Sequence, residues 1–186
     1  MVKKGTAPVK TYQLKITLCD SRPEIWRRIL VKSDTTLARL HDVLQSVMGW
    51  EDAHLHQFTI HGKEYGVPEE EDAERLLDER QYRLSNVITG GRFDYQYDFG
   101  DNWQHTIEIE KASPAEGKVR YPLCLDGARA CPPEDVGGIP GYKSFLEAIQ
   151  NPKHPQYKDL REWVGRDFDP EEFNVSKVNQ LLHALR

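Results

Sequence analysis

One stretch of the chain decides its fold class: Arg92-Phe-Asp-Tyr-Gln-Tyr-Asp-Phe-Gly-Asp-Asn-Trp-Gln-His-Thr-Ile-Glu-Ile-Glu-Lys111. Apolar and polar residues alternate on both sides of a turn, which is typical of a β hairpin with one buried face. The apolar faces carry Phe93, Tyr95, Tyr97 and Phe99 before the turn, and Trp103, His105, Ile107 and Ile109 after it. A three-residue loop, Gly100-Asp101-Asn102, would pair Phe99 with Trp103 and Tyr97 with His105, whereas a two-residue turn would mismatch the faces. We therefore predict the hairpin with a three-residue loop.

The rest of the chain is read from the same kinds of pattern. Alternation predicts strands near residues 11–19, 25–31 and 54–61, and apolar spacing predicts an amphipathic helix over Leu37–Met48. The acidic residues 67–80 indicate an exposed loop, and Asp169-Pro170 is typical of the start of a last helix. This order predicts an α+β fold: an antiparallel sheet built from hairpins with a β-β-α-β start, similar in order to a β-grasp, and a helical C-terminal tail.

We expect a flexible N-terminus over residues 1–10 and a single domain over 11–186. Within that domain we expect a hairpin and helix core over 11–111, a structured Pro/Gly loop over 112–141 and a helical tail over 142–186. The length of 186 residues suits one core. The odd number of cysteines, three, argues against a disulfide framework and favours the cytoplasm. No apolar stretch is long enough for a membrane span, so we expect no membrane partner.

Charge is distributed unevenly along the chain. Residues 1–50 carry nine basic and four acidic side chains, whereas the whole chain has a net charge of −5. The basic third could contact the phosphates of a nucleic acid, but the field of the whole protein would repel a polyanion. A nucleic-acid partner is therefore disfavoured, and we expect the basic side chains to pair with acidic ones.

Several long phrases occur together in this chain. They are Tyr12-Gln-Leu-Lys-Ile-Thr-Leu18, Ile25-Trp-Arg-Arg-Ile29, Leu37 to Trp50, His54-Leu-His-Gln-Phe58, Tyr97-Asp-Phe-Gly-Asp-Asn-Trp-Gln-His105, Ala130-Cys-Pro-Pro-Glu-Asp-Val-Gly-Gly138 and Asp167-Phe-Asp-Pro170. The chain thereby resembles the plasmid open-reading-frame-three family, first named from a root-inducing plasmid, from about residue 11 to 186. The resemblance implies an α+β domain found on plasmids, mobile elements and chromosomes, without an assigned biochemical activity.

Some members of that family are labelled transposon resolvases, but the residues here do not support recombinase chemistry. Cleavage of a DNA strand by a recombinase needs a Ser or Tyr nucleophile among several arginines that stabilise the phosphoryl transition state. Arg27 and Arg28 are adjacent on a predicted strand, so they point to opposite faces. The chain also lacks a helix-turn-helix pattern and a basic tail.

Metal binding is one candidate chemistry. His54 and His56 would share a face of a predicted strand, and the candidate ligands are His54, His56, His105, Cys124 and Cys131. Asp98, Asp101, Glu134 and Asp135 could add carboxylates for acid–base work, although Asp98 and His105 fall on opposite faces of the predicted hairpin. The alternative is that these groups are structural, and nothing in the sequence forces the segments together. We expect no cofactor; zinc or another divalent metal is the alternative.

Of the candidate functions, recognition of a partner by a surface requires the fewest features that the sequence lacks. The hairpin end and the Pro/Gly loop offer aromatic, arginine and acidic side chains of the kinds found at interfaces: Asp101, Trp103, Arg129, Glu134, Asp135 and Tyr142. We therefore predict a non-enzymatic module that binds another macromolecule, an unidentified protein partner. The alternatives are a metal-dependent enzyme and an accessory nucleic-acid-binding protein of a mobile element.

Overall fold

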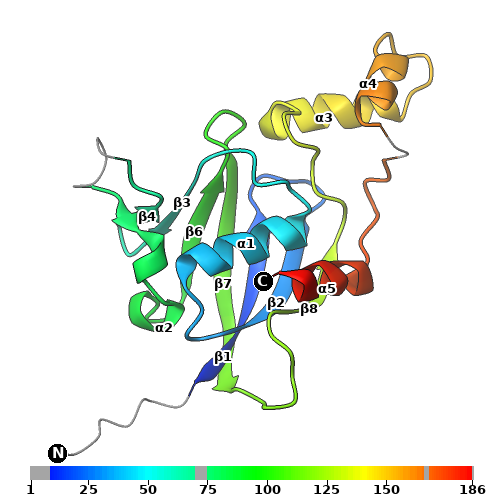
Figure 1. Ribbon diagram of the computed structural model, residues 1–186. Helices are drawn as coiled ribbons and strands as arrows, with labels where there is room; N and C mark the ends of the chain where they lie inside the picture. The colour runs from blue at the N-terminus through cyan, green and yellow to red at the C-terminus, as the bar shows by residue number, and fades with distance from the viewer. Residues whose placement is uncertain (1–8, 70–74, 166–167, 186) are drawn as a thin grey trace, which may run out of the picture.

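The computed structural model describes residues 9–69, 75–165 and 168–185. Its centre is one sheet of eight strands in the order β5-β4-β3-β6-β7-β1-β2-β8 (Figure 1). The strands are β1 (Lys10–Leu18), β2 (Ile25–Lys32), β3 (His56–Ile60), β4 (Lys63–Gly66), β5 (Leu77–Asp78), β6 (Arg92–Tyr97), β7 (Trp103–Pro114) and β8 (Leu123–Ala128). All neighbours pair antiparallel except β4 and β5, which are parallel. The predicted α+β class is confirmed.

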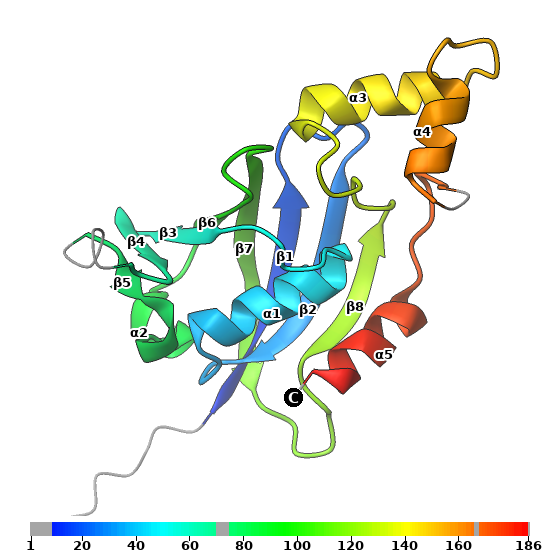
Figure 2. The same cartoon turned by 45° about the horizontal axis from the view of Figure 1, so that its top comes forward.

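Five α-helices accompany the sheet in the described parts of the chain. They are α1 (Leu37–Met48), α2 (Leu84–Val87), α3 (Gly138–Ile149), α4 (Tyr157–Trp163) and α5 (Val175–Ala184), with a 3-10 turn at Glu79–Gln81. Helices α1 and α5 lie side by side on one face of the sheet, and α3 and α4 project beyond one end of it (Figures 1 and 2). The side chain of Thr36 caps the start of α1, and Gly49 in the left-handed conformation ends it.

The core lies between α1 and the sheet. The apolar stripe of α1 is buried, with Leu37, Leu40, Val43 and Leu44 at most 1% exposed. The aromatic face of β3, β6 and β7 fills the other side with Phe58, Tyr95, Tyr97 and Trp103, which are fully buried. The alternating residues of β6 and β7 therefore place one aromatic face of these strands in the core.

The predicted hairpin register is wrong by two residues. Tyr97 lies opposite Trp103 and Tyr95 opposite His105, so the loop covers residues 98–102 instead of three residues. The loop is closed by a hydrogen bond from the amide of Asn102 to the carbonyl of Asp98, and both residues have positive φ. A shift of two keeps every side chain on its own face, so alternation alone does not reveal it.

Three further expectations differ from the structure or lie partly outside the described residues. The predicted Pro/Gly loop 112–141 contains β8, and α5 begins at Val175 behind the cap Asn174, several residues after Asp169-Pro170. Within the predicted exposed loop 67–80, Glu79 is only 3% exposed. Of the predicted flexible N-terminus, residues 1–8 lie outside the described residues. Among the residues described, no helix has the length and apolar character needed to cross a membrane.

Candidate functional site

Three segments far apart in the sequence meet at one end of the sheet. They are the residues after α1, the β6–β7 loop and the loop that leads from β8 to α3. The indole of Trp50 donates a hydrogen bond to the carbonyl of Pro132 at 3.0 Å, and the amide of Glu51 donates to Glu134 Oε1 at 2.8 Å. The amide of Gly137 donates to Asp101 Oδ2 at 3.0 Å. The predicted contact regions, the hairpin end and the Pro/Gly loop, are thus joined to each other and to α1.

His54 lies at the centre of this junction. Its Nε2 is 3.2 Å from Asp135 Oδ1, 3.6 Å from Glu134 Oε2 and 3.7 Å from Asp98 Oδ2. This nitrogen is shielded from solvent, yet it makes no hydrogen bond with the described residues. Tyr97 lies edge-on to the His54 ring, with 5.9 Å between ring centroids. Three carboxylates therefore surround one buried ring nitrogen without satisfying it.

The carboxylates are held in place by the backbone and by Tyr97. Asp98 Oδ1 accepts the amide of Gly100 at 2.9 Å, which leaves Oδ2 turned toward His54. The Tyr97 hydroxyl donates to Glu134 Oε1 at 3.1 Å and accepts the amide of Ala53 at 3.0 Å. Burial and the neighbouring Glu134 carboxylate raise the pKa of Tyr97, so the hydroxyl stays protonated and remains a donor.

His56 belongs to a different cluster from His54. Its ring stacks on His41 with 3.4 Å between centroids, and its Nε2 bonds Glu79 Oε2 at 2.9 Å. His41 bonds Asp52 at 2.7 Å and the Tyr95 hydroxyl at 2.8 Å. These contacts satisfy both nitrogens of His41 and Nε2 of His56, so the geometry is that of a structural network. The prediction that His54 and His56 share a strand face is wrong, because β3 begins only at His56.

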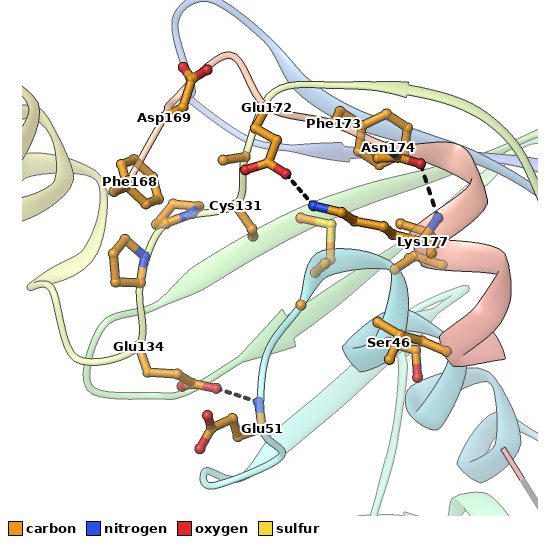
Figure 3. A pocket seen from close by; sticks show the side chains of 18 of the residues that line it. Ser46, Glu51, Cys131, Glu134, Phe168, Asp169, Glu172, Phe173, Asn174 and Lys177 are labelled. Atoms are coloured by element: carbon orange, nitrogen blue, oxygen red, sulfur yellow. Dashed lines mark hydrogen bonds and ion pairs between the residues drawn. The ribbon is translucent and has the colours of Figure 1, made fainter. Parts of the chain in front are cut away.

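A groove of about 710 Å³ opens beside the junction (Figure 3). Its walls are the C-terminal end of α1, the 130–135 loop, α5, and the residues Trp163, Val164, Phe168 and Asp169. Trp163 and Leu181 line it and are 48% and 52% exposed. Five acidic side chains and two basic ones also line it: Glu51, Glu134, Asp135, Asp169, Glu172, Arg27 and Lys177.

Neither basic side chain of the groove is free. Lys177 forms an ion pair with Glu172 at 2.8 Å, which Figure 3 marks with a dashed line. Arg27 is 2% exposed and donates hydrogen bonds to the carbonyls of Val47, Trp26 and Ala128, while its guanidinium lies 4.3 Å from the ring centroid of Phe173. Burial lowers the pKa of Arg27. The accessible charge of the groove is therefore negative.

The predicted surface residues divide into two groups. Trp103 is fully buried and Tyr142 is 6% exposed, so both belong to the core and not to a surface, because Trp50 packs on Trp103, and Phe145 and Phe168 pack on Tyr142. Asp101 and Glu134 tie the loops together, and Asp135 is exposed. Arg129 pairs with Glu171.

The predicted metal ligands do not converge. Clusters of three ligand atoms in the described chain contain His54 or His56, but none contains His105, Cys124 or Cys131. Burial lowers the pKa of His105 to about 4 and raises the pKa of Cys124 to about 11 and that of Cys131 to about 12. The two thiols therefore stay protonated at neutral pH, which makes them poor metal ligands.

Sequence reasoning missed the partners that His54 has in the structure. It placed Asp98 on a polar face, whereas the side chain is 9% exposed and turns toward His54. The positive φ of Asp98 and of Asp135 takes both residues out of regular structure, and no alternation pattern describes such positions.

Comparison with known proteins agrees with the resemblance in the sequence. The family model described as plasmid pRiA4b ORF-3-like protein matches residues 10–177. The chain belongs to this family. Protein y4hQ of Sinorhizobium fredii, described as uncharacterized, is 40% identical over 177 residues, which cover 93% of this chain and 91% of that protein.

A solved relative has the same fold as this member of the family. The crystal structure of MM3350, a protein of unknown function from Methanosarcina mazei Go1, is 39% identical with a TM-score of 0.85. The match covers 91% of this chain and 98% of the other.

Proposed function

We propose that the chain is a non-enzymatic module that binds another protein, and that the groove takes a segment carrying basic and apolar side chains. The observation that carries the proposal is the pairing of two exposed apolar side chains, Trp163 and Leu181, with an acidic lining. A large aromatic side chain that is half exposed in a concave site is a typical anchor for a partner.

Charge favours a basic partner over an acidic one or a nucleic acid. Because Lys177 and Arg27 are already engaged, the charges left to face a ligand include the carboxylates of Glu51 and Asp169. Opposite charge speeds encounter and selects among partners. On the strands, Arg28 bonds Glu110 at 2.7 Å and Lys15 pairs with Glu24 at 3.1 Å, which leaves less basic charge for phosphates.

A displayed library of random peptides, selected on the intact chain, tests this function. We expect enriched peptides that combine Lys or Arg with an aromatic or aliphatic residue. Their affinity should fall about tenfold or more in a Trp163→Ala, Leu181→Ser double variant, as for a hot-spot residue. The matched control is Leu125→Ser, because Leu125 is 39% exposed and lies outside the groove.

Two results would overturn the proposal. One is that no enriched peptide depends on Trp163 and Leu181. The other is that the dependent peptides are acidic, since the lining would then repel them. Added salt should weaken the expected binding, because the attraction between exposed charges is screened.

A further inference from the structure

The junction around His54 concentrates negative charge that no Lys or Arg side chain of the described residues balances. Asp98, Glu134 and Asp135 all lie within 4 Å of His54 Nε2, and none of them has a Lys or Arg partner among the described residues. The Asp98 side chain is 9% exposed, and its Oδ2 accepts no hydrogen bond from the described chain. A buried carboxylate of this kind is costly unless a cation lies beside it.

The distances are close to the edges of a metal coordination shell. Ligand atoms about 2.1 Å from one ion lie about 3.0 Å apart in octahedral geometry and about 3.4 Å apart in tetrahedral geometry. His54 Nε2 lies 3.2 Å from Asp135 Oδ1 and 3.7 Å from Asp98 Oδ2, and the ligand atoms of the three residues are within 4.8 Å of one another. The buried nitrogen is also the one that lacks a hydrogen-bond partner.

We propose that His54, Asp98 and Asp135 bind a divalent first-row transition-metal ion, such as Zn²⁺ or Mn²⁺. One imidazole nitrogen with two carboxylate oxygens is a donor set that these ions accept, whereas Mg²⁺ prefers oxygen ligands and retains its waters. Glu134 adds a third negative charge and is fixed by Tyr97 and by the amide of Glu51. The Asp135 side chain is 72% exposed, so an ion can enter from solvent.

The neighbouring cluster of His41, Asp52 and His56 is a weaker candidate. Both nitrogens of His41 already form hydrogen bonds, and Nε2 of His56 bonds Glu79. A metal there would have to replace these bonds. The two clusters share no residue, so single substitutions can distinguish between them.

Calorimetric titration of the chelator-treated full chain with Zn²⁺, Mn²⁺ and Mg²⁺, each alone, tests the site. We expect one saturable site per chain for Zn²⁺ and Mn²⁺, with a raised melting temperature, and much weaker binding of Mg²⁺. His54→Gln and Asp135→Asn should each weaken Zn²⁺ binding about tenfold or more, a loss at least as large as outer-shell changes cause. Asp135→Asn alters an exposed side chain, so it tests the site even if Asp98→Asn fails to fold.

Matched controls are Asp94→Asn and His183→Gln. Both side chains are exposed, and neither belongs to a cluster of candidate metal ligands among the described residues. The proposal is overturned if no saturable binding occurs, or if Zn²⁺ binds equally well to His54→Gln and Asp135→Asn. The Trp163→Ala, Leu181→Ser variant should keep the metal, because the inference does not rest on the proposed peptide groove.

Discussion

Trp50 and Pro132, 82 positions apart in the sequence, are joined by a hydrogen bond from the indole N–H to the prolyl carbonyl at 3.0 Å. The bond fixes the loop that carries Glu134 and Asp135 against the end of α1. Trp50→Phe keeps an aromatic ring but leaves the Pro132 carbonyl without this donor. We expect the free energy of unfolding to fall by about 1–3 kcal/mol, measured by urea denaturation.

The control for this change is Trp26→Phe. The indole N–H of Trp26 makes no hydrogen bond with the described residues, while its ring contacts Lys15 and Arg28. Equal losses in the two variants would contradict the role given to the bond between Trp50 and Pro132.

Adjacent arginines on β2 offer a matched pair. Arg27 is buried and donates to three carbonyls, from β2, α1 and the last residue of β8, whereas Arg28 reaches Glu110 at the surface. Arg27→Leu should cost about 3 kcal/mol, because three acceptors lose a charged donor. Arg28→Leu should cost about 1 kcal/mol or less, as for other exposed ion pairs. Equal losses in the free energy of unfolding, measured by urea denaturation, would contradict the role of Arg27 as a buried donor that holds three carbonyls together.

Gly138, at the start of α3, lies close to the backbone of the hairpin end. A Cβ at this position would lie 2.5 Å from the carbonyl oxygen of Asp101, and the residue has a φ of +66°. Gly165 has the same φ of +66°, but a Cβ there would contact nothing within 4 Å. We expect Gly165→Ala to cost about 1 kcal/mol from the backbone alone and Gly138→Ala clearly more. Similar melting temperatures for the two variants would contradict a tight contact between Gly138 and the Asp101 carbonyl.

Acid should destabilise the fold through His105. The ring is 1% exposed, and burial lowers its pKa to about 4 from 6.5. Below pH 6.5 the His105 ring is protonated in the unfolded chain but stays neutral in the folded chain, so the free energy of unfolding falls as the pH drops toward 4. The loss from this group is about 3 kcal/mol. Burial and the nearby His56 also lower the pKa of His41, which adds to the loss in the same direction.

His105→Leu removes this titration. The variant should lose about 3 kcal/mol less than the natural chain between pH 7 and pH 4, measured as the free energy of unfolding at each pH. An unchanged pH dependence would show that the buried ring is not the group that titrates.

The sequence predicted the class of the fold and most of its central elements because these depend on local periodicity. The helix over Leu37–Met48 is confirmed, and the opposite orientations of Arg27 and Arg28 are confirmed by their burial and partners. The hairpin register was not predictable, since a slip of two preserves both faces. The length of its loop depends on positive φ at Asp98 and Asn102, a local choice that alternation does not report.

The candidate site was predictable only in pieces. His54 and Asp135 each stood out by residue type, but the contact between them requires the loop before α3 to fold back over the end of α1. Trp103 and Tyr142 look like interface residues by type, and only the packing shows that they are buried. Residue type therefore indicated the candidates, while long-range packing decided which of them share a site.

The most direct test of the junction is ¹⁵N nuclear magnetic resonance of the seven histidine rings during addition of Zn²⁺ to the intact chain. His54→Gln assigns the His54 signal. We predict that one equivalent of Zn²⁺ moves the Nε2 resonance of His54 to a metal-bound position and leaves the ring nitrogens of His41 and His56 in place. An unmoved His54 signal, or movement of the His41 and His56 signals instead, would contradict a metal site formed by His54, Asp98 and Asp135.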